Sequence, residues 1–372
     1  MSTNPYIITP NEVGSAQSSE LIQYIRKYID TLQQQLQVSG AILFRGFDVP
    51  QPTVFESIAK TFDGDLKNDY LGTSPRNIVK GTDYVFSASE LPPHYPIMQH
   101  CEMSFLPTAP RRLMFYCYIQ PEIGGETPIC DFRAVAKSMN PKIKQEFEKK
   151  GIKVIRNYCA PGHEKSNSFQ LKPWVDMFQT KDKSIVEKKS AENNITVEWL
   201  ENDALRLISD HTAFKKHPQS GEEAWFNHLQ VFHASAAAME YAKITKRQKT
   251  FDALKVNLYL QTVTFLKKFT EKPIDRAMHV CYADGSEIPE SYIQHVQDLI
   301  WENMYFLKWQ KGDVIILTTS LLHMVVCRIK DLEKYRFRGL RKNQITSIKK
   351  AGISCLLFLF IRMSLLIKTN HF

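Results

Sequence analysis

Apolar residues recur at helical spacing near the start of the chain. In the segment 18–37 they fall every three or four positions, at Leu21, Ile22, Ile25, Tyr28, Ile29, Leu32 and Leu36. This spacing predicts one amphipathic helix, and a serine at its start is the expected N-cap. The sequence PTVFESIAKTF at 52–62 predicts a second helix.

Shorter apolar runs between turn residues predict β-strands. They occur at 40–49, 112–121 and 122–131, with turns expected at Gly46 and at Gly124–Gly125. Further short strands or turns are expected at 152–159, 224–233, 279–285 and 312–317. The charged segments 132–150 and 183–209 are expected to be helices inserted over a sheet. Together these patterns predict an α+β fold with a mainly β core, a sandwich or barrel, decorated by N-terminal and inserted helices.

Composition narrows the class of protein. The chain has 372 residues, 43% of them hydrophobic and 11% aromatic, which suits one large or two modest globular domains. Its seven cysteines are scattered without a C-x-x-C pair, so reduced thiols in the cytoplasm are expected. The apolar run 353–367 is short for a membrane span and is interrupted by Arg362, which predicts no membrane insertion.

The net charge of +9 is unevenly distributed. Residues 318–372 hold 11 Lys+Arg and 2 Asp+Glu, whereas residues 1–317 hold 37 of each. A body without net charge produces no general positive field, so nucleic-acid binding is not expected. The charge instead separates a domain at 1–317 from a basic tail at 318–372.

A histidine and a glutamate stand one residue apart in QHCEMSF, at His100 and Glu102. On a β-strand these two side chains would point to the same face and could hold one metal ion. A non-haem Fe(II) site uses two histidines and one carboxylate and leaves positions open for co-substrate and oxygen. The other interpretation of the pair is a surface ion pair or a hydrogen-bonded polar group of the core.

The sequence around this pair carries a longer motif. His100, Glu102 and Pro107 precede a strand, and Gly124, Gly125, Thr127 and Asp131 follow it. With the segments 217–233, 282–289 and 309–317, this order resembles the taurine dioxygenase-like family of Fe(II)/2-oxoglutarate oxygenases, most closely its clavaminate synthase-like branch. The resemblance covers residues 40–317 and implies a double-stranded β-helix (jelly roll) that binds Fe(II) and 2-oxoglutarate.

The resemblance also implies roles for single residues. His100 and Glu102 would be iron ligands, Thr127 would donate a hydrogen bond to 2-oxoglutarate, and the two glycines would form a tight turn. Three residues could face substrate or only pack, with packing favoured for the first: Trp225, Asn227 and His233. His94 and His228 have no motif support and are expected to be structural or exposed.

The family's pattern is interrupted after residue 317. Family members continue with Asp-Asn, then the distal iron ligand in His-Gly-Arg, and a later arginine that binds 2-oxoglutarate. This chain continues TTSLLHMVVCRIK, so His323 is the nearest substitute for the third ligand, one position out of register. Arg341 is the corresponding substitute for the 2-oxoglutarate arginine.

A shifted reading frame would restore that pattern. Consider the reading frame that begins at the third base of each codon for residues 317–335. In that frame the codons of Met324 and Val325 overlap in a glycine triplet, and the neighbouring codons permit histidine before it and arginine after it. Asp-Asn and a later Arg-Lys are also permitted at the family spacing. This favours one missing nucleotide near codon 317, with the tail as out-of-frame translation. The alternative is a diverged tail with a function of its own.

These patterns predict a 2-oxoglutarate-dependent dioxygenase that oxidises a small molecule with O2. Glu102 in place of aspartate is shared with family members that hydroxylate amino acids, which indicates an amino acid or related carboxylate as substrate. The alternative is a catalytically impaired β-helix protein that has lost the distal site. The oligomeric state does not follow from the sequence.

Overall fold

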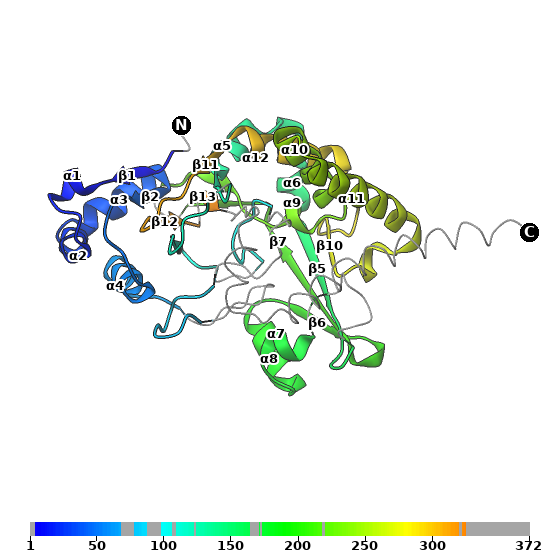
Figure 1. Cartoon of the computed structure of the whole chain (residues 1–372). Coiled ribbons are helices and arrows are strands. Elements are labelled where there is room, and N and C mark those ends of the chain that lie inside the picture. The colour runs from blue at the N-terminus through cyan, green and yellow to red at the C-terminus, as the bar shows by residue number, and fades with distance from the viewer. Residues whose placement is uncertain are drawn as a thin grey trace, which may run out of the picture.

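The computed structural model describes residues 4–67, 78–87, 98–105, 109–122, 124–163, 171, 173–217, 220–319 and 322–324. The N-terminal part consists of β1 (Tyr6–Ile8), α1 (Pro10–Val13), α2 (Ser18–Lys27), α3 (Ile29–Ser39), β2 (Ala41–Phe44) and α4 (Pro52–Phe62). These helices lie together at one side of the molecule, far from α10 and α11 (Figure 1).

The expected helix over 18–37 is two helices. The chain breaks at Tyr28, whose φ and ψ are −113° and 21°. The expected serine cap is also wrong, because Gln17 precedes α2 and makes no side-chain cap bond. Leu21 and Leu32 are nevertheless both buried, so the apolar spacing identified the inward face on each side of the break.

One four-stranded sheet has the order β1-β2-β12-β3, with β3 at Arg112–Tyr116 and β12 at Val314–Thr318. Alternate residues of β2 and β12 face opposite sides of this sheet. On one side Ile42, Phe44 and Ile316 pack against the apolar faces of α2, α3 and α4. We call this cluster the first core.

A three-stranded sheet, β11-β4-β13, lies across from the first sheet. It contains β4 (Thr127–Asp131), β11 (Met304–Leu307) and β13 (Leu322–Met324). The inward residues of both sheets, among them Leu43, Ile129 and Ile315, form a small cluster that we call the middle core. The strands of these two sheets pair antiparallel except for β1 and β2, which are parallel. The two layers with apolar side chains between them are the sandwich that the strand pattern predicts.

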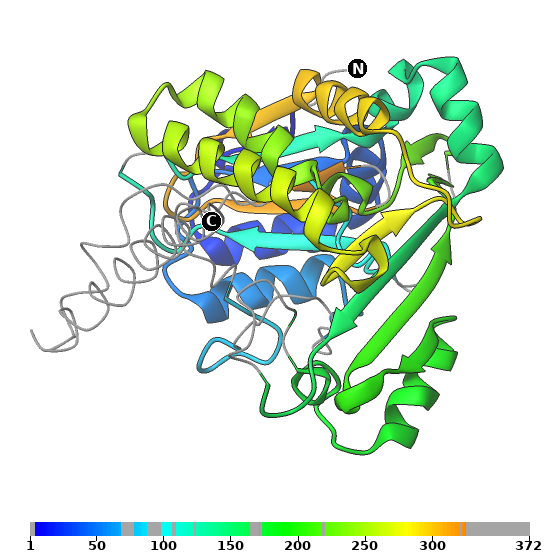
Figure 2. The same ribbon diagram turned by 90° about the vertical axis from the view of Figure 1, so that its right-hand side faces the viewer.

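The remaining four-stranded sheet, β10-β5-β7-β6, extends away from the other two. Its strands are β5 (Ile152–Tyr158), β6 (Thr196–Trp199), β7 (Leu205–His211) and β10 (Met278–Cys281). The long pair β5 and β7 runs toward α7 (Trp174–Phe178) and α8 (Lys183–Glu192), as Figure 2 shows. A two-stranded ribbon of β8 (Phe214–Lys216) and β9 (Glu223–Trp225) follows β7.

The inserted region is less helical than expected. Residues 132–150 form α5 (Phe132–Ser138) and α6 (Pro141–Lys150), as predicted. In 183–209, however, the helix ends at Glu192, and β6 and the start of β7 follow. Asn194 has a left-handed φ of 54°, which terminates the helix, and the alternation in TVEW and LRLIS is that of strands.

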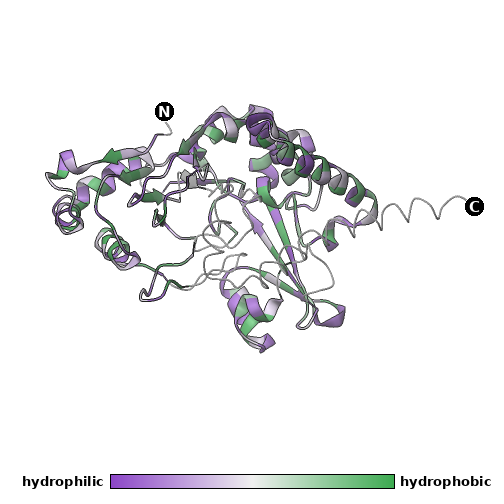
Figure 3. Cartoon of the chain, in the orientation of Figure 1, coloured by the Kyte–Doolittle hydropathy of each residue, from purple (hydrophilic) through white to green (hydrophobic). Residues whose placement is uncertain are grey.

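Several C-terminal helices were not predicted, and the first of them lies in the segment 224–233, which was expected to be a short strand or turn. They are α9 (Leu229–Phe232), α10 (Ala236–Gln248), α11 (Phe251–Thr270) and α12 (Glu290–Glu302). Figure 3 shows hydrophilic and hydrophobic segments alternating along these helices. Among the described helices, none has both the length and the apolar character needed to cross a membrane.

The largest apolar cluster gathers around β5, β9, α5 and α12. It includes Phe105, Cys130, Val154, Trp225 and Phe232, all buried. We call this cluster the second core. It lies on the side of β4 opposite the middle core, because Cys130 and Ile129 are adjacent on that strand and point to opposite faces.

Candidate functional site

The segment with His100 and Glu102 is held between β4 and β9. Gln99 donates from its side chain to the carbonyl of Pro128 at 2.8 Å. Cys101 is fully buried, and its thiol donates to the carbonyl of Trp225 at 3.5 Å. Two contacts to separate strands therefore fix the backbone on either side of His100.

His100 and Glu102 do not share a strand, contrary to expectation. Glu102 lies in a turn that the amide of Ser104 closes by donating to the carbonyl of Cys101 at 3.0 Å. Met103 has a φ of 53° in this turn. The turn folds Glu102 back toward His100, so the side chains still converge without the strand geometry.

The two side chains meet at 3.4 Å between Nε2 of His100 and Oε2 of Glu102. His100 Nδ1 lies 2.8 Å from the carbonyl oxygen of Met98, which can only accept, so Nδ1 carries the proton. Such a backbone bond to the far nitrogen is the usual support of a metal-binding histidine. Two adjacent ligands, each about 2.1 Å from an octahedral ion, are about 3 Å apart, so this pair could hold a divalent metal.

His228 lies directly beside this pair. It is 5% exposed, its Nδ1 is 2.6 Å from the Ser104 hydroxyl, and its ring centroid is 5.3 Å from that of His100. Its ring also contacts Phe105 and Phe232. Of the two expected roles for His228, structural or exposed, the structure shows a buried one. No local spacing could have revealed the contact, since 124 residues separate Ser104 from His228.

Thr127 begins β4 and is fully buried. Its hydroxyl oxygen accepts from the indole nitrogen of Trp309 at 2.6 Å. Because an indole N–H only donates, the hydroxyl hydrogen of Thr127 is left to donate to another acceptor. The sequence patterns did not predict that Trp309, the first residue of the segment WQKGDV, would donate a hydrogen bond to Thr127.

The glycine turn before β4 is as expected. Gly124 and Gly125 have φ values of 67° and 73°, in the left-handed region. A Cβ on Gly125 would lie 2.6 Å from the Pro121 ring, so this position excludes other residues.

The three residues of segment 217–233 with open roles are all buried. Trp225 is fully buried between Phe147 and Phe214. Asn227 donates to the carbonyl of Ala213 at 2.9 Å and accepts from the amide of Leu229 at 2.8 Å. Burial lowers the pKa of His233 to about 4, so this histidine is neutral near pH 7.

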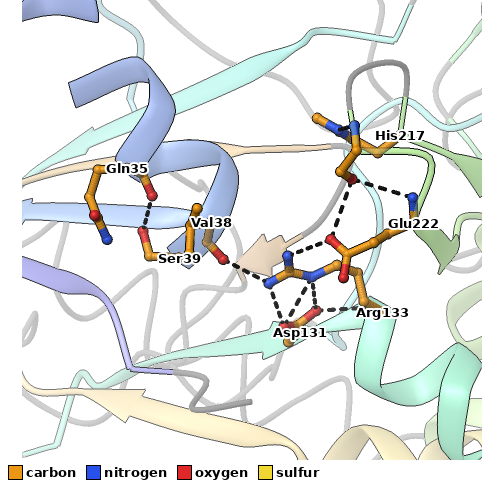
Figure 4. A network of polar contacts seen from close by, with 8 residues as sticks. Gln35, Val38, Ser39, Asp131, Arg133, His217 and Glu222 are labelled. Atoms are coloured by element: carbon orange, nitrogen blue, oxygen red, sulfur yellow. Dashed lines mark hydrogen bonds and ion pairs between the residues drawn. The ribbon is translucent and has the colours of Figure 1, made fainter. Parts of the chain in front are cut away.

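Asp131 at the end of β4 belongs to a buried ion-pair network, shown in Figure 4. Its carboxylate binds the Arg133 guanidinium at 2.8 Å and also accepts from the Arg133 amide, capping α5. Arg133 further pairs with Glu222 at 3.0 Å and donates to the Val38 carbonyl at 3.1 Å. The network ties β4 to α3 and to the β8–β9 ribbon, which is a structural role.

The predicted third ligand lies on β13. His323 stands opposite Cys130 of β4 in the antiparallel register. Within the described part of the chain, no group of three metal-ligating residues is assembled. Arg341, Pro107, His94 and nearly all of the predicted tail 318–372 lie outside the described residues.

Comparison with known proteins decides the family. The model for the taurine catabolism dioxygenase TauD, TfdA family matches residues 9–324. The chain belongs to this family. TauD-family dioxygenases use Fe(II) and 2-oxoglutarate, and act with O2 on small molecules.

Two relatives of the TauD family cover most of the chain. The dapdiamide synthesis protein DdaC of Enterobacter agglomerans is 28% identical over 78% of this chain and 79% of its own. A clavaminate synthase-like protein of Arabidopsis thaliana is 26% identical over 82% of each chain. Among solved structures, a taurine dioxygenase from Burkholderia xenovorans has a TM-score of 0.41 and 10% identity, covering 81% of this chain and 73% of that one. The family assignment rests on the sequence match alone.

Proposed function

We propose that this TauD-family chain is an Fe(II)- and 2-oxoglutarate-dependent dioxygenase that oxidises an amino acid or a related small carboxylate. The observation that carries the proposal is the 3.4 Å approach of His100 Nε2 and Glu102 Oε2, with the far nitrogen of His100 bonded to Met98. The name of the relative in dapdiamide synthesis also fits a small-molecule substrate.

In this proposal each residue has a separate task. His100 and Glu102 hold the iron, His323 on β13 contributes the distal histidine, and Thr127 orients 2-oxoglutarate through its hydroxyl hydrogen. Arg341 is proposed as the second 2-oxoglutarate contact. The bound iron and 2-oxoglutarate supply the oxidative chemistry. The protein supplies orientation and exclusion of water, and the largely buried His100–Glu102 pair suits the latter.

We further propose that the two facing sheets form a double-stranded β-helix, that residues 1–317 are the catalytic domain, and that residues 318–372 follow a frame change. The protein is proposed to act in the cytoplasm. A chain without the distal His-Gly-Arg segment would be impaired, and this second candidate is favoured by the departure after residue 317. Sequencing the gene around codon 317 tests it: an uninterrupted, well-supported frame would contradict the missing nucleotide.

The metal site is tested by anaerobic titration with Co(II). The His100→Ala and Glu102→Ala variants should each weaken Co(II) binding by more than about 100-fold, because loss of even an outer-shell partner costs about 10- to 100-fold. His295→Ala is the matched control, since His295 lies on α12 and accepts from the Asn140 amide at 3.0 Å. Unchanged Co(II) affinity in both site variants would refute the proposed ligands.

A further inference from the structure

Arg156 is a charged residue inside the second core. It lies on β5 and is 1% exposed. Ile152, Val154 and Tyr158 alternate with it on the same face of the strand and belong to that core. An arginine is therefore directed into the largest apolar cluster of the molecule.

The guanidinium of Arg156 has few partners there. Its Nη1 donates to the Tyr158 hydroxyl at 3.3 Å, and its Cζ lies 4.4 Å from the Phe105 ring centroid. Its Nε is buried without a hydrogen-bond partner among the described residues. No carboxylate of the described residues forms an ion pair with it. Burying an unpaired charge is costly, so such an arrangement calls for an explanation.

Other arginines of the described chain show the usual solution. Arg45 pairs with Asp313 at 2.7 Å, Arg133 with Asp131 at 2.8 Å, and Arg206 with Asp275 at 3.0 Å. Arg206 is especially informative because it lies on β7, next to β5. It also donates to the side chain of Asn157, the neighbour of Arg156. Among the described residues, two neighbouring strands thus carry one paired and one unpaired buried arginine.

Arg156 is connected to the candidate site by direct contacts. Phe105, which its guanidinium covers, lies 5.0 Å from the His228 ring. The His228 ring in turn lies 5.3 Å from that of His100. Two rings, those of Phe105 and His228, therefore link the Arg156 guanidinium to His100.

We propose that Arg156 binds the carboxylate of the small molecule oxidised at the His100–Glu102 site. A planar guanidinium matches a carboxylate in two parallel hydrogen bonds, and a ligand carboxylate would supply the missing counter-charge. This inference rests on the proposed function and assigns the residue that recognises the free carboxylate of its substrate.

A carboxylate could also come from 2-oxoglutarate. In the proposed function both compounds bind at the His100–Glu102 site, so the test measures the affinity for 2-oxoglutarate separately from the KM for the substrate.

The test compares the full-length protein with Arg156→Met and Arg156→Lys, and with Arg206→Met as the matched control. Succinate release is measured with Fe(II), ascorbate, 2-oxoglutarate and a panel of L-amino acids, each alongside its carboxamide. In parallel, thermal shifts by the same compounds without metal report binding independently of turnover. The affinity for 2-oxoglutarate is measured separately, by titration of the Co(II)-loaded protein.

We expect Arg156→Met to raise the KM for the stimulating amino acid about 10- to 100-fold. The affinity for 2-oxoglutarate should be unchanged, and the carboxamides should be poor ligands of every protein. The Tm of Arg156→Met without ligand should equal or exceed that of the wild type, because the variant removes an unpaired buried charge. Arg156→Lys should recover part of the affinity, and Arg206→Met should lower the Tm without changing KM.

Three results would overturn the inference. They are an unchanged KM in Arg156→Met, a weakening of 2-oxoglutarate binding alone, or a lower Tm with kcat reduced and KM constant. Failure of the proposed function looks different. In that case the wild type would release no succinate with any compound, yet Arg156-dependent thermal shifts by amino acids would still support the carboxylate site.

Discussion

The first and second cores are built from similar apolar side chains but differ in the polar groups they enclose. The first core joins α2, α3 and α4 to one sheet through residues such as Leu21, Phe44 and Ile316. The buried charge on α4, Glu56, is paired, because it accepts from two backbone amides, at 2.7 and 2.8 Å. The second core surrounds Arg156 and lies against His228. Buried polar groups lower stability unless they are paired. Under the inference drawn for Arg156, the first core serves folding and the second also serves a ligand.

The largest expected effect is in the first core. Phe44→Ala should lower the free energy of unfolding by about 3–5 kcal/mol, because it removes a fully buried ring and leaves a cavity. Denaturant unfolding measures this change. Co(II) affinity of the folded variant should equal that of the wild type; a weaker metal site would show that the two cores are not separable.

Acid should destabilise the region around the second core. Burial lowers the pKa of both His211 and His233 to about 4, whereas an unfolded histidine has a pKa of about 6.5. Between those values the unfolded chain binds protons that the folded chain does not. Stability is therefore fully present above pH 6.5 and is lost as pH falls toward 4, by up to about 3 kcal/mol per histidine.

Unfolding at a series of pH values checks this dependence. His233→Gln should remove the part that His233 contributes and leave that of His211. An identical pH slope in the variant and the wild type would mean that His233 is not buried in its neutral form.

The smallest effect is expected in the middle core. Thr127→Val should weaken the apparent affinity for 2-oxoglutarate in turnover about 5- to 10-fold, because one hydrogen bond to a charged ligand is lost. Initial rates of succinate release over a range of co-substrate concentrations measure this change. Thr127→Ser keeps the hydroxyl and is the matched control. If valine and serine behave alike, Thr127 only packs against Trp309.

Much of the local structure was predictable. The strands at β2, β4, β5 and β12 and the turn at Gly124–Gly125 follow from short-range patterns of apolar and turn residues, and all are present. The strands after Glu192 were missed because charged residues on their outer positions imitate a solvated helix. Tyr28 was missed because the apolar spacing continues unchanged across the break.

The sequence by itself determined the family and the His100–Glu102 pair, because both are written in residues that lie close together along the chain. Tertiary structure alone decided that His228 lies beside His100, that Trp309 bonds Thr127, and that Arg156 covers Phe105 without a carboxylate partner among the described residues. The last two contacts join residues on different sheets or loops, as 182 positions separate Thr127 from Trp309. Local periodicity predicts which face of a strand is buried. The residues that this face contacts depend on how one element packs on another, which the local sequence does not specify.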